Sequence, residues 1–194
     1  MREMARLGLI LMAMGLVCAA ALGFVNSRTK ERIAKQREMA RQEAMNLAAA
    51  SLGSELTFDS IEVQGLSNPY SETGRTLSPV RVSSAGRPMG YVFTAYRKGY
   101  SSVIETMVAV DLEGTIAGST ILFQAETPGL GTRYADPAWQ ARLVGQTAPA
   151  LEKDGGEIAG VTGATVSGRA IVGSVADGIE ALRAAGLFEE GGGL

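Results

Sequence analysis

The sequence predicts an α+β protein in which a single N-terminal transmembrane helix with a stalk precedes a domain built from an antiparallel sheet packed by helices. Three observations lead to this prediction: an uncharged apolar run near the N-terminus, a series of strand-like segments joined by short turns, and an amphipathic helical segment close to the C-terminus. The predicted divisions are a transmembrane anchor at 1–26, a helical stalk at 27–50, a folded domain at 51–190 and a disordered tail at 191–194.

The apolar run from Leu7 to Val25 carries no charged side chain. As a helix it reaches roughly 28 Å, about the hydrocarbon thickness of a bilayer, so a transmembrane anchor is the favoured interpretation. Two other interpretations stay open. Ala19 and Ala21 could form the small-residue cleavage site of a signal peptide. Cys18 could carry a lipid, although Val17 stands where a small residue normally precedes such a cysteine.

The segment after the span is basic and contains no proline or glycine, which predicts a helix that continues out of the membrane. Arg2 and Arg6 precede the span, and a larger set of cations follows it: Arg28, Lys30, Arg32, Lys35, Arg37 and Arg41. By the positive-inside rule, this difference places the folded domain in the cytoplasm. If only its run of charged residues is considered, this segment is typical of a solvent-exposed helix without a specific role.

The middle of the chain is typical of β-structure. Strand-forming residues fill 91–96, 103–110 and 115–123. Asp111 to Gly114 has the composition of a hairpin turn, so we expect consecutive strands to pair in antiparallel fashion. Residues 68–87 are rich in Pro, Gly and Ser and are expected to form a loop.

An amphipathic helix of about five turns is predicted after Thr165. Its apolar residues recur at three- and four-residue spacing and should pack on the sheet: Ile171, Val175, Ile179 and Leu182. Gly186 fits a C-terminal stop for this helix.

Composition excludes several classes of site. The chain has no histidine, and Cys18 is its single cysteine. A histidine-dependent catalytic triad, a zinc site and an iron–sulfur cluster therefore lack their usual ligands, and we expect no metal site. The formal net charge of -2 provides no basic field for nucleic acid, so none is expected as a partner. Redox work by such a chain requires an organic cofactor.

The segment from Gly160 to Gly168, G-V-T-G-A-T-V-S-G, leads directly into the predicted C-terminal helix. Its small residues let a ligand approach the backbone, and the open N–H groups of a helix start attract a phosphate. The commoner alternative is that a hydroxyl side chain such as Thr165 caps the helix. The segment lacks the lysine of a P-loop, and no βαβ unit surrounds it as a dinucleotide fingerprint requires.

A second candidate segment, E-T-P-G-L-G from Glu126 to Gly131, follows the third predicted strand. One proline and two glycines favour a tight turn whose N–H groups could face a cofactor ring. Glu126 could order the turn by accepting backbone hydrogen bonds. On local grounds alone, an ordinary loop is the alternative.

Together, the two segments resemble a known family. T-G-A-T at Thr162 to Thr165 is similar to the flavinylation motif of membrane subunits that carry FMN on a threonine, and E-T-P-G-L-G is similar to a turn in the same proteins. The apolar N-terminus, the basic stalk and Gly99-Tyr100 before a strand also fit. Over nearly its whole length the chain resembles the G subunit of the Rnf electron-transport complex, and more distantly the C subunit of the sodium-pumping NADH:quinone oxidoreductase.

The resemblance implies that 51–190 is an FMN-binding domain and that Thr165 carries covalent FMN through a phosphoester, made by a separate flavin transferase. The expected cofactor-binding residues are Thr162, Gly163, Ala164, Ser167, Glu126, Thr127, Leu130 and Gly131. The implied role is electron relay, without substrate turnover of its own, beside other Rnf subunits that couple ferredoxin and NAD to ion movement. The resemblance also implies a flavin domain on the outer face of a bacterial cytoplasmic membrane, which conflicts with the orientation expected from charge.

Two positions depart from the family pattern. The acidic residue that usually stands six before the modified threonine is Ala159 here, with Asp154 and Glu157 nearby. The histidine that often precedes the turn is replaced by Gln124 and Ala125. Two other functions stay open: a membrane-tethered flavoprotein sensor or oxidoreductase outside the pump, and a non-redox scaffold whose threonine only caps the helix.

Overall fold

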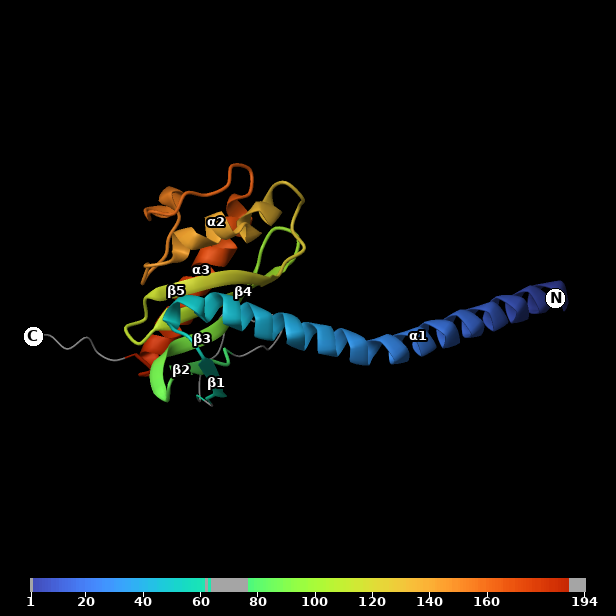
Figure 1. The fold of residues 1–194 in the computed structure, drawn as a ribbon. Coiled ribbons are helices and arrows are strands. Elements are labelled where there is room, and N and C mark those ends of the chain that lie inside the picture. The colour runs from blue at the N-terminus through green and yellow to red at the C-terminus, as the bar shows by residue number, and fades with distance from the viewer. Residues whose placement is uncertain (1, 62, 64–76, 189–194) are drawn as a thin grey trace, which may run out of the picture. The chain divides into compact units, whose positions relative to one another are not determined.

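The computed structural model describes residues 2–61, 63 and 77–188, and Figure 1 shows their arrangement into helices and strands. The helices are α1 (Arg2–Ala49), α2 (Pro137–Gln140) and α3 (Thr165–Ala184). The strands are β1 (Leu56–Ser60), β2 (Val80–Ser84), β3 (Arg87–Lys98), β4 (Val103–Asp111) and β5 (Ile116–Phe123). Short 3₁₀ turns lie at Ala50–Leu52, Gly131–Ala135, Ala141–Leu143 and Glu152–Asp154. The chain divides into two compact units, Met1–Arg41 and Gln42–Leu194.

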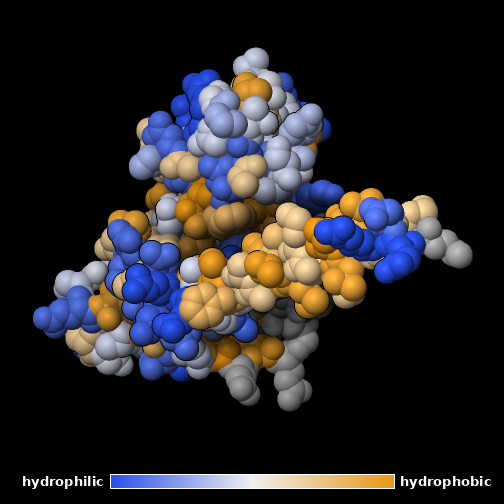
Figure 2. Space-filling view, turned by 90° about the vertical axis from the view of Figure 1, so that its right-hand side faces the viewer, coloured by the Kyte–Doolittle hydropathy of each residue, from blue (hydrophilic) through white to orange (hydrophobic). Residues whose placement is uncertain are grey.

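The first unit is the greater part of α1. Among the described residues, α1 is the one helix long and apolar enough to cross a membrane. In Figure 2, apolar residues make up much of its N-terminal segment, and hydrophilic residues lie toward its tip. Exposed large apolar side chains run along this segment from Met4 to Val25, whereas an amphipathic helix of a soluble protein buries its apolar face. The predicted anchor is therefore helical, and it continues unbroken into the predicted stalk.

The second unit is built on a five-stranded antiparallel sheet in the order β1-β2-β3-β4-β5, so every strand pairs with its neighbours in sequence. Ala85 and Gly86 join β2 to β3 with φ values of 49° and 77°. Positive φ at both central positions characterises the type I′ turn, which matches the twist of a hairpin. Between β4 and β5, the Asp111 carboxylate accepts hydrogen bonds from the N–H groups of Glu113 (3.1 Å) and Thr115 (2.7 Å). The predicted hairpin turn is confirmed.

One face of the sheet carries α3 and the larger apolar core. Side chains alternate between the two faces along a strand, so every second residue of β3 and β4 points toward α3. The strand residues in this core are Tyr91, Phe93, Ala95, Ile104, Val108 and Val110. The helix supplies the residues that its periodicity predicted: Ile171, Val175, Ile179 and Leu182.

The opposite face of the sheet is covered by the last turns of α1. From Gln42 onward this helix belongs to the second unit. Its small residues Ala44, Ala48 and Ala49 form a second core with Leu52 of the following 3₁₀ turn. The strand residues of this core are Val82, Val92, Met107 and Ala109. The Ser51 hydroxyl donates to the carbonyl of Ala117 at 2.7 Å, which ties the end of this helical segment to β5.

Polar contacts hold α3 against the sheet, and a capping motif ends the helix. The Arg97 side chain of β3 forms an ion pair with Asp177, and its Nη1 donates to the carbonyl of Arg169 at 3.4 Å. At the C-terminus, Gly186 has φ 70° and donates to the carbonyl of Arg183 at 3.0 Å. The N–H of Leu187 donates to the carbonyl of Leu182 at 3.2 Å, which completes a Schellman motif. Gly186 ends the helix as predicted.

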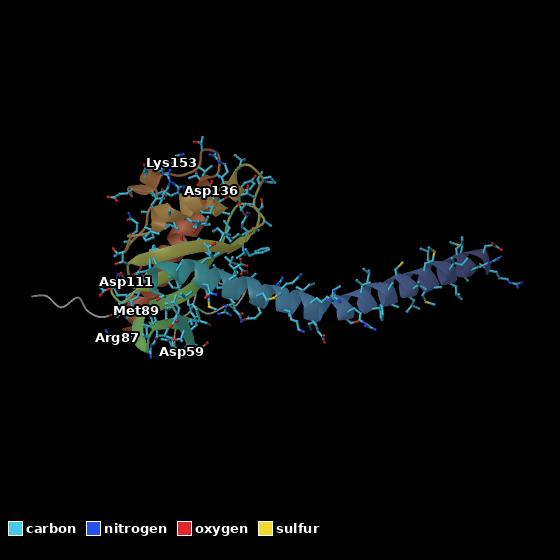
Figure 3. All side chains as sticks on the ribbon, in the orientation of Figure 1. Asp59, Arg87, Met89, Asp111, Asp136 and Lys153 are labelled. Carbon is cyan, nitrogen blue, oxygen red and sulfur yellow. The ribbon has the colours of Figure 1, made fainter. Side chains whose placement is uncertain are left out.

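Between β5 and α3 the chain forms a series of short helical turns. Asp136 begins α2 by accepting a hydrogen bond from the N–H of Ala138 at 2.9 Å. The Trp139 indole donates to the carbonyl of Ala159 at 2.9 Å, which closes this segment on itself. Figure 3 shows Asp136 and Lys153 in this part of the domain, away from a group of labelled residues on β1, β3 and β4: Asp59, Arg87, Met89 and Asp111.

The sheet is larger than the sequence predicts. The strands expected at 91–96, 103–110 and 115–123 are present, but β1 and β2 were not expected. The loop expected over 68–87 is wrong at 80–84, where Val80 and Val82 are buried, Arg81 between them is exposed and Ser83 is half-buried. This alternation is typical of a strand, and the surrounding Pro, Gly and Ser obscured it. Residues 68–76 and the tail predicted at 191–194 lie outside the described residues.

We expect Gly178→Ala to lower the free energy of unfolding by about 1–3 kcal/mol, because the added Cβ would overlap the Phe93 ring in a packed core. The better helix propensity of alanine, about 1 kcal/mol, offsets only part of this loss. Urea unfolding of the full chain in detergent, followed by the fluorescence of Trp139, measures the change. As a control, Glu180→Ala changes an exposed residue of the same helix and should alter stability by less than about 0.5 kcal/mol. Equal stability of the two variants would contradict the packing argument.

Candidate functional site

A buried carboxylate connects three segments that are distant in sequence. Glu126 follows β5 and has 5% of its surface exposed. Its Oε1 accepts hydrogen bonds from the backbone N–H groups of Ser101 (3.0 Å) and Ser102 (2.9 Å). Its Oε2 accepts from the N–H of Tyr100 (3.1 Å) and from the Ser167 hydroxyl (2.6 Å). The carboxylate therefore joins the β3–β4 hairpin and the first turn of α3 to the segment after β5.

These hydrogen-bond donors stabilise the ionised form of the Glu126 carboxyl group. Burial raises the pKa of its carboxyl, but the hydrogen bonds from Ser167 and from the backbone N–H groups of Ser102, Ser101 and Tyr100 outweigh this, so the net pKa is lowered. A buried carboxylate at neutral pH is therefore ionised and satisfied by hydrogen bonds rather than by a cation.

Two glycines make room for this carboxylate. A Cβ on Gly99 would lie 2.7 Å from Oε1 of Glu126, and a Cβ on Gly131 would lie 2.6 Å from the Glu126 Cβ. Neither distance is tolerated by packed atoms, so both positions require glycine for close approach. The last glycine of the E-T-P-G-L-G segment thus has a packing role.

The segment after Glu126 forms the tight turn that its proline and glycines predict. The N–H of Leu130 donates to the carbonyl of Thr127 at 3.2 Å, with Pro128 and Gly129 between them. Gly129 has φ 75°, as the third residue of a type II turn requires, and Pro128 occupies the position where proline is favoured. The N–H of Gly129 donates to the Thr132 hydroxyl at 3.0 Å, which fixes the tip of the turn.

Thr165 is the first residue of α3 rather than its cap. Ala164 occupies the cap position, where no side-chain hydrogen bond is made, and Gly163 precedes it with φ 82°. The Thr165 side chain is half-buried, and no described residue hydrogen bonds with its hydroxyl. A capping threonine would accept a hydrogen bond from an N–H group of the first turn. The structure therefore gives no support to the capping interpretation of Thr165.

The backbone of this helix start is also open. Within the part of the chain that the structure describes, the N–H groups of Thr165, Val166 and Ser167 have no carbonyl or side-chain acceptor, whereas the N–H of Gly168 donates to the carbonyl of Ala164 at 3.1 Å. Unpaired N–H groups and the positive end of the helix dipole favour an anionic group at this position.

Tyr134 supports the segment that leads into α3. Its buried hydroxyl accepts a hydrogen bond from the N–H of Val161 at 2.9 Å, and its ring packs edge-on against Trp139 at a centroid distance of 4.5 Å. Burial raises the pKa of Tyr134, and the hydrogen bond from Val161 only partly opposes this, so the phenol is neutral at physiological pH. A Cβ on Gly168 would overlap this hydroxyl, so the glycine lets α3 approach it.

These segments line an open cavity of about 490 Å³, a size typical of small-molecule and cofactor sites. Its lining residues are Tyr100, Glu126, Thr127, Leu130, Gly131, Gly163, Ala164, Thr165, Val166 and Ser167. Of the residues predicted for a cofactor site, only Thr162 is absent from this lining. The Ser167 hydroxyl is engaged with Glu126, so it positions the helix start.

Sequence reasoning missed Tyr100 and Val166 as lining residues. Val166 follows Thr165, so its place in the motif was the available signal. Tyr100 was noted only as part of Gly99-Tyr100, and no local pattern connects it with a helix that begins 65 residues later. Glu126 makes this connection through space.

The acidic residues near the motif lie in another environment. Ala159 stands where an acidic residue was expected, and its carbonyl is occupied by the Trp139 indole. Asp154 accepts hydrogen bonds from Arg169 Nε and Nη2, the shortest at 2.6 Å, on the exposed side of α3. Among the described residues, no group of three or more histidine, cysteine or acidic side chains could hold a metal ion.

Two sequence families match the chain. Residues 99–180 match the family described as the FMN-binding domain, and residues 1–47 match the family described as the RnfG N-terminal region. The chain is 30% identical to the G subunit of the Na⁺-translocating ferredoxin:NAD⁺ oxidoreductase complex of Acetobacterium woodii, over 88% of this chain and 87% of that protein. The chain belongs to this family of G subunits. The G subunit of an ion-translocating oxidoreductase complex from Shewanella loihica is 29% identical over 82% of this chain and 80% of its own length.

Solved structures share the fold of this family member. NqrC from Shewanella oneidensis aligns with a TM-score of 0.59 at 21% identity, over 78% of this chain and 96% of the other. The C subunit of the Na⁺-translocating NADH-quinone reductase from Parabacteroides distasonis aligns with a TM-score of 0.58 at 14% identity, over 82% of this chain and 98% of the other. The predicted α+β architecture is confirmed.

We expect Glu126→Gln to lower the free energy of unfolding by about 1–3 kcal/mol at neutral pH, since an amide replaces a charged acceptor of several donors. Because the folded pKa of Glu126 lies below its ordinary value, its ionised form stabilises the fold above the ordinary glutamate pKa. This stabilisation is lost as the pH falls through the folded pKa.

Urea unfolding of the wild type and of Glu126→Gln at a series of acid pH values tests this prediction. The difference between the two proteins should shrink as the pH falls. The exposed Glu152→Gln serves as the control and should follow the wild type. A difference that stays constant into the acid range would show that the charge of Glu126 is not responsible.

Proposed function

We propose that this G subunit is a membrane-anchored electron carrier, with FMN esterified through its phosphate to Thr165, in an ion-translocating ferredoxin:NAD oxidoreductase complex. The observation that carries this proposal is the Thr165 hydroxyl, which has no hydrogen-bond partner among the described residues and lines a cavity at an open helix start. The match of residues 99–180 to the FMN-binding domain family supports the identity of the cofactor.

The residues around Thr165 fit a phosphate diester. Such a group carries one negative charge, and the unpaired N–H groups of Thr165, Val166 and Ser167 offer hydrogen bonds to its oxygens. The helix dipole adds roughly 0.3–1 kcal/mol of stabilisation at an exposed site, and more where the charge is partly buried. Gly163, with φ 82°, keeps the approach to this backbone free of a side chain.

Attachment requires a reaction at the Thr165 hydroxyl. The hydroxyl oxygen would form a bond to the flavin phosphorus of a flavin dinucleotide and lose its proton to solvent, while the bond from that phosphorus to the second phosphate breaks and a nucleoside monophosphate leaves. No described residue hydrogen bonds with the Thr165 hydroxyl to take its proton, which supports the action of a separate flavin transferase. The hydroxyl is half-buried but uncommitted, so it can enter the active site of another protein.

The remaining residues of the cavity would hold the flavin ring. FMN supplies the reversible electron transfer that the side chains of this chain lack. Leu130 and Val166 offer apolar surface, while Thr127 and Gly131 lie on the turn beside the helix start. Glu126 keeps these segments together, so the cavity exists before the cofactor is attached.

The proposed partners follow from the relatives and from α1. The named relatives are subunits of ion-translocating oxidoreductase complexes, which supports assembly with other Rnf subunits. The apolar segment of α1 supports anchoring in a bacterial cytoplasmic membrane, in contact with lipid. With one such helix among its described residues, this protein would transfer electrons, and its partners would conduct the ion.

We expect Thr165→Ala to remove covalent flavin, because alanine has no oxygen to form the ester. Full chains produced with a flavin transferase are compared by intact mass and by flavin fluorescence on a denaturing gel. The wild type should gain the mass of FMN less one water. Thr57→Ala is the control, because Thr57 is an exposed threonine of β1 outside both the motif and the cavity lining, and it should keep its flavin. A flavin-bearing Thr165→Ala chain would refute the attachment site.

We expect the flavin domain to lie on the outer face of the membrane, as the family resemblance implies. Lys153→Cys, in a Cys18→Ser background, places a single thiol on an exposed residue of this domain (Figure 3). A membrane-impermeant maleimide should label it in intact cells or spheroplasts. Glu3→Cys in the same background is the control for the opposite side and should react only after lysis. The reverse pattern would support the orientation expected from charge.

A further inference from the structure

Tyr100 is an unusually exposed aromatic residue at the edge of the candidate site. Its side chain is 72% exposed, the highest value among the large apolar residues described between 42 and 188. It nevertheless lines the cavity that contains Thr165. Burial of an aromatic ring contributes strongly to stability, so an exposed ring at a cavity suggests a role in contacting a ligand.

The backbone that carries this ring is held in place. The N–H of Tyr100 donates to Glu126 at 3.1 Å, and the N–H of Gly99 donates to the carbonyl of Ser102 at 2.7 Å. The N–H groups of Ser101 and Ser102 donate to the same carboxylate. The hairpin tip is thus fixed by four hydrogen bonds, while the ring itself is left exposed.

Two further apolar side chains border the same cavity. Leu130 on the turn is 41% exposed, and Val166 in the first turn of α3 is 53% exposed. The three residues come from separate segments that Glu126 holds together through Tyr100 and Ser167. Clustered exposed apolar residues at one cavity indicate a binding surface for a flat apolar group.

We propose that Tyr100 covers the isoalloxazine ring of the flavin and lowers its reduction potential. This inference rests on the proposed function, because it requires FMN on Thr165. The π-face of a tyrosine ring is negatively polarised, so it disfavours the electron-rich reduced flavin relative to the oxidised flavin. The phenol also quenches flavin fluorescence: it passes one electron to the excited ring and takes it back, with no net oxidation.

Two variants separate the parts of this role. Tyr100→Phe keeps the aromatic face but removes the easily oxidised phenol, whereas Tyr100→Leu removes both. Both variants change an exposed side chain and keep the backbone hydrogen bonds to Glu126, so the domain should fold. Tyr96→Phe is the control, because Tyr96 lies on β3 and does not line the cavity.

The full chains are produced with a flavin transferase and studied in detergent, and intact mass first establishes the flavin content. Fluorescence per covalent flavin should rise severalfold in Tyr100→Phe and Tyr100→Leu, and stay at the wild-type value in Tyr96→Phe. The reduction potential should move to a less negative value in Tyr100→Leu and stay close to the wild type in Tyr100→Phe.

The outcomes distinguish the two proposals. A wild type without covalent flavin refutes the proposed function. A fully flavinylated set in which both Tyr100 variants keep the wild-type fluorescence and potential overturns the role of Tyr100 and leaves the proposed function intact. An equal change in Tyr96→Phe also overturns it, since the effect would then not come from the cavity.

Discussion

The candidate site depends on one buried anion with several hydrogen-bond donors. Glu126 accepts hydrogen bonds from three successive backbone N–H groups of the β3–β4 hairpin and from the hydroxyl of Ser167. A buried carboxylate without such donors would be costly, so its presence constrains each segment that surrounds it. Gly99 and Gly131 are required because no Cβ fits against it. The cavity walls are therefore positioned by a single side chain that need not touch the reacting atoms.

The sequence predicts those elements whose pattern is local. The helix α3 has apolar residues on one face and a glycine at its end, and the structure confirms both features. The strands β3, β4 and β5 contain runs of strand-forming residues, and a turn with Asp111 separates the last two. By contrast, β2 shows only a short alternation around Val82, and its partner β1 is half exposed. Pairing with β3 stabilises such strands, and no window of sequence contains that information.

As with the fold, the sequence predicted those parts of the candidate site whose pattern is local. The two small-residue segments contain most of the residues that line the cavity, because glycine, proline and hydroxyl residues have strong local meaning at turns and helix starts. Tyr100 and Tyr134 were not predictable in their positions. Each contacts the site through a long-range hydrogen bond, one to Glu126 and the other from Val161. Such contacts depend on the completed fold rather than on neighbouring residues.

An ester to Thr165 would also explain why an exposed site is compatible with function. Leu130, Val166 and Tyr100 are partly or largely exposed, so a flavin held by them alone would bury little surface and dissociate readily. A covalent bond removes this requirement for burial. The ring could then stay accessible to electron donors and acceptors in partner proteins. The helix start would provide the charge stabilisation, and Glu126 would keep the walls in place without covering the ring.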